Sequence, residues 1–258
     1  MSEFDKGPPV AIGRILERVP DPPDTDDFWF DWGPVFYRGR LNGTARVLCV
    51  ASDPGPTERI AGRTLVGNAG QRVQGFLAKL GLTRSYLCLN AWAYALHPSS
   101  YFPELARLDE PAQLGWRNDL YDAATGPALE AVVAFGGMAQ AAVGLWVGRP
   151  PGAQLVEIPH PSNPKEADLL AAWRQAITDL RAVVTPDADG DNSGPNYGAK
   201  FAEADYARIP AHDLPFGCPA FLGDDAWVRA APGAAMNSVG RPDPDDAHTL
   251  IWRAPTSP

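Results

Sequence analysis

The chain has 258 residues, of which 45% are hydrophobic and 21% are charged, and its net charge is −9. These values are typical of a globular protein with one substantial core. The apolar runs fall short of the roughly 18 residues that a membrane-spanning helix needs, and the opening "MSEFDKGPPVAIGR" lacks the apolar centre of a secretion signal. We therefore expect a cytoplasmic monomer without a membrane partner.

The charge is unevenly distributed along the chain. Residues 33–100 hold eight basic residues against two acids, a net +6, whereas residues 186–258 hold eleven acids against five basic residues, a net −6. A locally positive surface attracts phosphates whatever the total charge of the protein. A nucleic-acid partner therefore stays open, and the alternative is that these arginines only keep the protein soluble.

The predicted elements begin after an irregular arm. Residues 1–32 are rich in proline and aspartate, and their aromatic side chains are expected to dock on the main body. Beyond the arm, short apolar runs of strand length alternate with segments of helical periodicity. The predicted strands are residues 45–51, 86–92, 130–137 and 154–164, and the predicted helices are residues 70–81, 111–129, 138–147 and 165–184.

This alternation predicts an α/β fold. Nearly all-apolar strands are typical of a parallel sheet that is buried on both faces. We expect a three-layer α/β/α domain over residues 33–184, with a central, mostly parallel four-stranded sheet. Residues 185–258 are rich in turn-forming residues and acids, and they predict a loop-rich C-terminal extension that packs on this domain.

Three polar residues lie at strand ends: Asp53, Asn90 and His160. In parallel sheets, ligands bind at the carboxyl ends of the strands, so these side chains are expected to converge. A carboxylate can orient water or stabilise a cation, an amide can read a ring edge, and an imidazole can donate to a developing anion. Together they suit cleavage of the bond between a sugar and a heterocyclic leaving group.

Five short segments between residues 45 and 182 carry these polar residues and the nearby glycines. They read "ASDPG" (51–55), "GRTLVGNAGQ" (62–71), "LCLNA" (87–91), "VVAFGGMAQAAVGL" (132–145) and "IPHPSNP" (158–164). In this order they resemble the motifs of the uracil-DNA glycosylase superfamily, and five ordered matches are more specific than any one of them. The resemblance implies a monofunctional DNA glycosylase that flips out a pyrimidine and leaves an abasic site.

The resemblance also implies roles for individual residues. The catalytic residues would be Asp53, which activates water or stabilises the sugar cation, and His160, which stabilises the departing base. The base-binding residues would be Asn90, Ser52, Gly55 and Leu65. The DNA-binding residues would be Arg63, Gly67, Gly70, Gln71, Pro161, Ser162, Asn163 and Lys165.

The chain departs from the family pattern in its cysteines and in its pocket wall. One branch holds an iron–sulfur cluster on four cysteines, but this chain has only Cys49, Cys88 and Cys218, so no cluster and no other metal or cofactor is expected. Gly55 stands where another branch has a tyrosine that excludes a methyl group at C5 of the base, and Leu65 replaces a stacking aromatic. The base could be uracil, as in DNA repair, or a C5-modified pyrimidine, as in defence against modified phage DNA.

Other functions stay open on the residues alone. Asp53 could only cap a turn, Asn90 could be a satisfied buried amide, and His160 could be a plain loop residue. A catalytically silent nucleic-acid-binding module on the same fold is the main alternative. A Ser-His-Asp hydrolase using Ser52 or Ser162 lacks the G-x-S-x-G turn, and an NTPase would need a G-x-x-x-x-G-K-[ST] loop that the sequence lacks.

Overall fold

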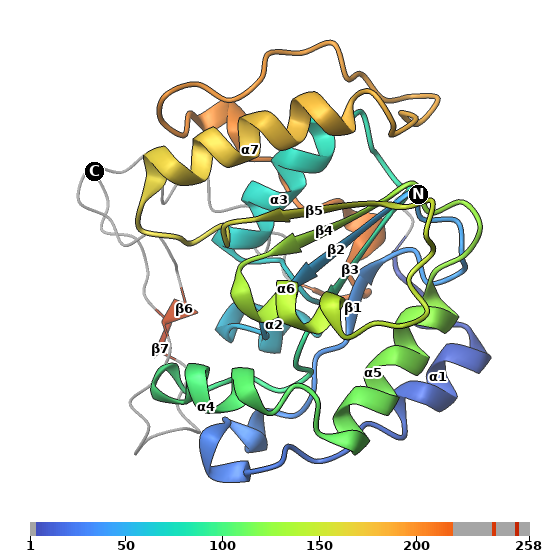
Figure 1. The fold of residues 1–258 in the computed structure, drawn as a ribbon, viewed down its shortest axis with the longest axis vertical. Helices are drawn as coiled ribbons and strands as arrows, with labels where there is room; N and C mark the ends of the chain where they lie inside the picture. Colours follow the sequence, from blue (N-terminus) through green and yellow to red (C-terminus); the bar gives the residue numbers. More distant parts are fainter. Residues whose placement is uncertain (1–3, 219–238, 241–250, 253–258) are drawn as a thin grey trace.

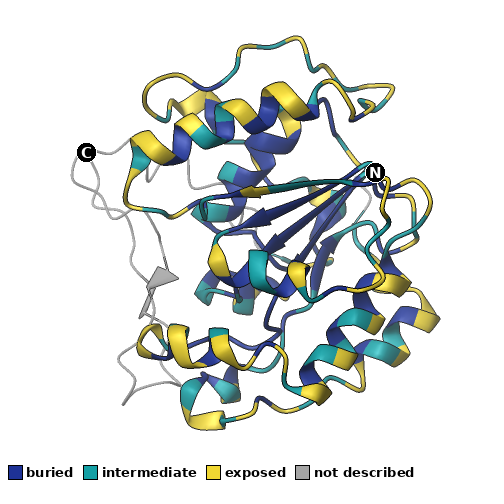
Figure 2. Ribbon diagram, viewed as in Figure 1, coloured by how far each residue is buried: buried dark blue, intermediate teal, exposed yellow. Residues whose placement is uncertain are grey.

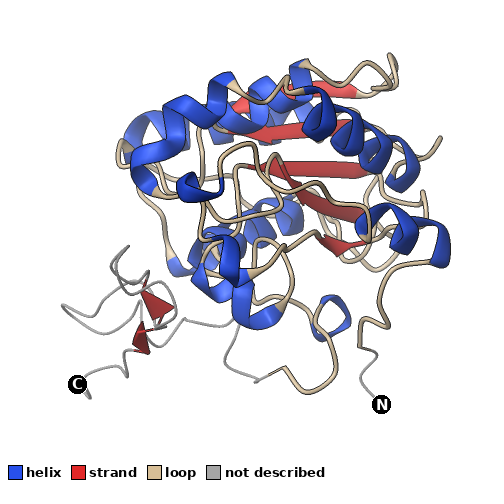
Figure 3. Cartoon of the chain, turned by 90° about the horizontal axis from the view of Figure 1, so that it is seen from below, coloured by secondary structure: helices blue, strands red, loops and turns tan. Residues whose placement is uncertain are grey.

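The computed structural model describes residues 4–218, 239–240 and 251–252 (Figure 1). Its centre is a sheet with the strand order β1-β3-β2-β4-β5, in which only β1 runs antiparallel to its neighbour. The strands are β1 (Tyr37–Gly39), β2 (Val47–Ala51), β3 (Tyr86–Asn90), β4 (Ala131–Phe135) and β5 (Gln154–Ile158). The view from below shows them side by side (Figure 3). The predicted α/β class with a mostly parallel sheet is confirmed, with one strand more than predicted.

Helices cover both faces of this sheet (Figure 1). The α-helices are α1 (Val10–Leu16), α2 (Pro56–Ala61), α3 (Asn68–Lys79), α4 (Tyr101–Ala106), α5 (Pro111–Ala124), α6 (Gly137–Gly144) and α7 (Glu166–Leu180). Short 3-10 helices span Thr25–Asp27, Phe30–Trp32, Pro98–Ser100, Glu203–Asp205 and Ala211–Asp213. None of the helices in the described part of the chain combines the length and apolar character needed to cross a bilayer.

The central strands are buried on both faces, as Figure 2 shows. Successive side chains of a strand point to opposite faces of a sheet. In β2, Cys49 therefore packs in the cluster that contains α3 and α7 side chains, and Leu48 packs in the cluster that contains α5 and α6 side chains. Double burial explains why these strands read as continuous apolar runs rather than as alternating patterns.

The structure differs from the sequence prediction at elements that are too short for a periodic signal. Strand β1 has three residues and carries Arg38 at its centre, and α2 and α4 have six residues each. Helix α1 lies within the arm that was predicted to be irregular. The strand predicted for 154–164 ends at Ile158 because Pro159 and Pro161 have no N–H to donate to a ladder, and the helix predicted for 111–129 ends at Ala124.

The described part of the C-terminal extension packs on the main body and supplies a charge to its core. Arg38 and Asp213 form an ion pair of 3.0 Å, and their side chains are 0% and 1% exposed. The hydroxyl group of Tyr86 also donates to Asp213, at 2.7 Å. A buried guanidinium needs such a partner, because an unpaired charge in the core is very unfavourable.

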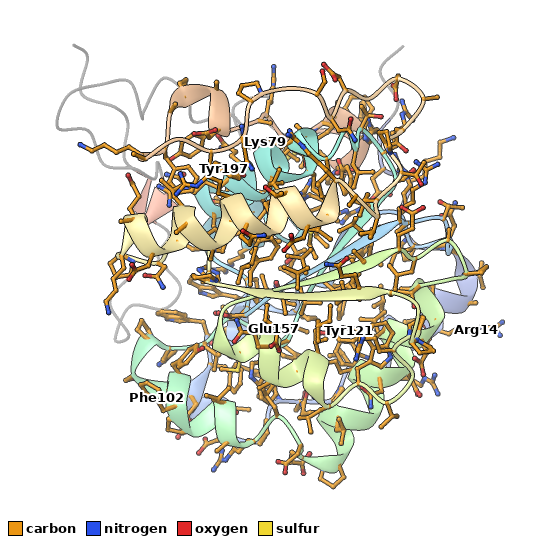
Figure 4. All side chains as sticks on the ribbon, turned by 45° about the horizontal axis from the view of Figure 1, so that its top comes forward. Arg14, Lys79, Phe102, Tyr121, Glu157 and Tyr197 are labelled. Carbon is orange, nitrogen blue, oxygen red and sulfur yellow. The ribbon has the colours of Figure 1, made fainter. Side chains whose placement is uncertain are left out.

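Ion pairs between distant segments of the chain neutralise part of the uneven charge. Four basic residues of the +6 segment bind acids from the arm or the extension. The pairs are Arg38–Asp213, Arg46–Asp187, Arg63–Asp5 and Lys79–Asp205. Lys79 also lies over the ring of Tyr197, at 4.8 Å (Figure 4). The locally positive surface expected from the sequence is therefore smaller than the residue count indicates, because these charges are neutralised within the fold.

Asp187 fixes the start of the extension to the turn before β3. Its carboxylate accepts hydrogen bonds from the N–H groups of Thr83 and Arg84, both at 2.8 Å, and of Ser85, at 3.0 Å. Partial burial raises the pKa of Asp187, but hydrogen bonds from the Ser85 hydroxyl and these N–H groups outweigh it and lower the pKa from 3.8 to about 2.

This pKa leads to a stability prediction. Because the carboxyl group binds its proton more weakly in the folded state, its contribution is complete above the unfolded-state pKa and is lost as the pH falls from 4 towards 2. We expect Asp187→Asn to lower the free energy of unfolding by about 1–2 kcal/mol at pH 7 and by much less near pH 2. Urea unfolding of both proteins across this range measures the difference, and a gap that is independent of pH would contradict the assignment.

Candidate functional site

The strands β2 to β5 end at one edge of the sheet, and two cavities lie there. Their volumes are about 520 Å³ and about 570 Å³. Both cavities are lined by Asp53, His160, Ser162 and Asn163. The structure therefore brings together the acid and the imidazole that the sequence placed at separate strand ends.

Asp53 follows β2 and is held by the segment that follows β3. Its Oδ2 accepts a hydrogen bond from the N–H of Leu96, at 2.9 Å. The two segments stay paired beyond the sheet, since the N–H of Trp92 donates to the carbonyl of Ser52 at 2.9 Å. The backbone thus fixes the direction of the Asp53 carboxylate at the cavity wall.

Asn90 is the last residue of β3 and is 7% exposed. Neither its Oδ1 nor its Nδ2 has a hydrogen-bond partner among the described residues. Asn90 pairs in register with Ala51, which lines the first cavity, so both side chains lie on the same face of the sheet. The lining of neither cavity includes Asn90 itself. Asn90 therefore lies next to Ala51, on the face of the sheet that contributes Ala51 to the first cavity.

His160 is fixed by close packing and by its own turn. Gly136 has a φ of 86°, and a Cβ atom there would lie 2.9 Å from the Cβ of His160, so only glycine fits. The N–H of Ser162 donates to Nδ1 of His160 at 3.2 Å. In the neutral ring, an accepting Nδ1 leaves the proton on Nε2, so this nitrogen is the donor.

Leu65 forms part of the first cavity in a strained conformation. Leu65 has a φ of 53°, and among the described residues it is the one non-glycine residue with a positive φ. Gly70 is required beside it, because a Cβ atom there would lie 1.8 Å from the carbonyl oxygen of Leu65. Strained backbone is concentrated at functional sites, where the surrounding structure enforces it.

Glu58 organises the same wall, although none of the five sequence segments that resemble the family motifs contains it. This residue is 8% exposed, and its carboxylate accepts from the N–H groups of Val66 (2.8 Å), Gly67 (2.9 Å) and Gly55 (3.1 Å). It therefore joins the turn after β2 to the start of α3. The capping-box spacing between position 55 and a glutamate three residues later is a signal that could have found it.

The predicted base-binding and DNA-binding residues differ in whether they line a cavity, are exposed or are buried. Gly55, Leu65 and Gly67 line the first cavity, and Ser52 lines the second. Ser162 and Lys165 are exposed, and Asn163 is half-buried, whereas Gly70, Gln71 and Pro161 are buried. Arg63 donates to Asp5 at 2.7 Å, and it is not among the residues that line these two cavities. Only some of the predicted base-binding and DNA-binding residues are therefore accessible to a ligand in this conformation.

Two further residues at these cavities were missed by the sequence analysis. Arg72 lines the first cavity, and Tyr101 lines the second. The hydroxyl group of Tyr101 accepts a hydrogen bond from the N–H of Met138, at 3.0 Å, at the start of α6. Neither residue belongs to a motif that sequence spacing could have identified.

The cysteines do not form a cluster site in the described part of the chain. Cys49 and Cys88 are paired in register on β2 and β3, and both are fully buried. Within the described residues, no group of three or more His, Cys, Asp or Glu side chains could hold a metal ion. An iron–sulfur cluster of the four-cysteine kind therefore does not fit this arrangement.

Comparison with models of known protein families gives no match, and comparison with curated proteins gives none. The function is therefore inferred from the side chains at the two cavities. A carboxylate and an imidazole line both cavities, and the buried amide of Asn90 ends a neighbouring strand at the same carboxyl edge of the sheet.

Proposed function

We propose that the chain is a monofunctional DNA glycosylase that flips a pyrimidine out of DNA and hydrolyses its N-glycosidic bond. The observation that carries this proposal is the buried, unpartnered amide of Asn90, which pairs in register with Ala51 at the wall of a cavity lined by Asp53 and His160. An unsatisfied buried polar group costs about 1–3 kcal/mol, and a ligand that supplies its partners would remove this cost. A pyrimidine edge offers both a donor and an acceptor to such an amide.

The proposed reaction assigns a separate task to each side chain. The Asp53 carboxylate, held by the N–H of Leu96, orients a water molecule towards C1′ and stabilises the positive charge that develops on the sugar. The bonding electron pair leaves with the base, and Nε2–H of His160 donates to the ring oxygen that becomes negative. Water forms the new C1′–O bond, and the proton that it loses is balanced by the proton that the released base takes up.

The size of the first cavity and the residues of its wall favour a substrate base that carries a C5 substituent. A volume of about 520 Å³ lies within the roughly 300–1,000 Å³ that is typical of small-molecule sites. Gly55 and Leu65 line this cavity and place no aromatic ring there. We therefore propose that the substrates include C5-modified pyrimidines in single- or double-stranded DNA, with uracil as the simpler alternative.

A panel of oligonucleotides tests this proposal. The panel holds uracil, 5-hydroxymethyluracil or glycosylated hydroxymethylcytosine at one position, in single-stranded and duplex form. We expect release of at least one C5-modified base, measured as strand breakage at the abasic site after alkali. Activity on uracil alone would contradict the substrate assignment. Normal binding without release of any base would instead support a catalytically silent nucleic-acid-binding module.

A further inference from the structure

Arg72 connects the candidate site to the C-terminal extension. It lies in the first half of α3 and lines the first cavity. Its Nη1 donates to the carbonyl oxygen of Pro161 at 2.5 Å, and its Nε donates to the hydroxyl group of Tyr206 at 3.0 Å. Its guanidinium carbon lies 4.2 Å from the ring centre of Phe201. One planar cation thus contacts the turn that carries His160 and two aromatic rings of the extension.

The extension is fixed where it meets Arg72. The N–H of Ala207 donates to the carbonyl of Gln71, at 3.0 Å, and Lys79 forms an ion pair with Asp205 at 2.9 Å. Contact is close, because a Cβ atom on Gly75 would lie 1.9 Å from the carbonyl oxygen of Asp205. The rings that hold the guanidinium are therefore attached to α3 itself and give Arg72 a rigid setting.

The turn that carries His160 is held on both sides of that residue. Nε1 of Trp173 donates to the carbonyl of Pro159 at 3.0 Å, and Arg72 donates to the carbonyl of Pro161. The imidazole lies between these two anchors. Loss of the Arg72 anchor would remove the side-chain hydrogen bond to the carbonyl of Pro161, and a shift of about 1 Å at a reacting group can reduce a rate about 100-fold.

We propose that Arg72 is a positioning residue, which fixes the imidazole of His160 by joining Pro161 to Tyr206 and Phe201. For its catalytic consequence, this inference rests on the proposed glycosylase function. It gives residues 201–206 a role at the site, because they hold the guanidinium in the plane that meets Pro161. A planar guanidinium can make two directed bonds while it stacks on a ring, whereas a lysine ammonium cannot reproduce that geometry.

Proton NMR of the histidine rings tests the positioning role without any substrate. The chain has four histidines, so the His160 signal is identified by its loss in His160→Gln. We expect Arg72→Ala and Arg72→Lys to shift or broaden the His160 signal and to leave the other three histidine signals in place. Arg174→Ala is the matched control, because Arg174 of α7 also binds the extension, at the carbonyls of Tyr197 (3.3 Å) and Gly198 (2.9 Å).

Each outcome of this measurement decides the role of Arg72. An unchanged His160 signal in Arg72→Ala, or an equal change in Arg174→Ala, would overturn the proposal. A His160 signal in Arg72→Lys that matches the wild-type signal would mean that the positive charge alone is sufficient. This result would also overturn the proposal. The lysine variant keeps the positive charge and the aliphatic stem, so it decides the question even where the alanine variant does not fold.

Steady-state base release over a range of substrate concentrations tests the catalytic consequence. On the best substrate of the panel, we expect both Arg72 variants to lower kcat about 10- to 100-fold, with KM changed less than about threefold. Arg174→Ala should stay within twofold of wild type in both. Equal losses in the Arg72 and Arg174 variants would contradict a positioning role. If wild-type protein releases no base, the glycosylase proposal fails while the NMR comparison still decides whether Arg72 positions His160.

Discussion

Asp53→Asn is expected to lower kcat for base release by about 10²–10⁴-fold while DNA binding is retained. Asparagine keeps an oxygen that can accept from the N–H of Leu96, so the turn after β2 should be preserved. What is lost is the negative charge that orients water and opposes the positive charge on the sugar. Single-turnover release of the base measures the rate, and fluorescence anisotropy with a non-cleavable 2′-fluoro oligonucleotide measures binding.

Glu157 offers a matched control for this variant. It is an exposed carboxylate near the end of β5 (Figure 4), and it lines the second cavity. Glu157→Gln removes one negative charge from the same edge of the sheet, and we expect it to change kcat by less than about threefold. Similar losses in the two variants would mean that the net charge of the edge, and not the placement of Asp53, controls the rate.

The largest expected effect on stability follows from Asp213→Ala. Removal of one partner from a buried ion pair leaves an uncompensated charge, which typically costs about 3–5 kcal/mol. Here the abandoned group is Arg38, which is fully buried, and the hydroxyl group of Tyr86 loses its acceptor as well. Equilibrium unfolding in urea at pH 7 measures the change in the free energy of unfolding.

Two further variants separate the effect of burial from the loss of charge. Asp24→Ala removes a carboxylate that is 46% exposed and lies 3.9 Å from Arg107, and we expect a loss of less than about 1 kcal/mol. The double variant Arg38→Met, Asp213→Ala should recover part of the loss, because no unpaired charge is left in the core. A double variant that is less stable than Asp213→Ala would contradict this account.

The fold was largely predictable because the core strands follow a simple physical rule. Strands such as β2 and β4 are buried on both faces and are therefore apolar throughout, which sequence periodicity detects. Strand β1 was not predictable, because three residues around a buried arginine look like a loop. The arginine at its centre pairs with Asp213, which lies 175 positions away in the sequence, and no local pattern contains such a partner.

The candidate site was predictable only in outline. Asp53, Asn90 and His160 could be placed at one edge because the carboxyl ends of parallel strands meet there. The sequence could not identify Arg72 as a site residue, since its role depends on two aromatic rings of the extension. The extension folds back over α3 and brings these rings to Arg72. The charge pattern was misleading for the same reason: counting basic residues along the chain does not reveal which acids they meet in the folded protein.

The ion pair between Arg38 and Asp213 has a consequence for the order in which the protein can fold during synthesis. Arg38 leaves the ribosome early, but its counter-charge follows 175 residues later. Contacts between positions so distant in sequence close a long loop and form late in folding. The buried ion pair at the β1 edge of the sheet can therefore form only after nearly all of the described chain has been made, and until then the charge of Arg38 needs water or another partner.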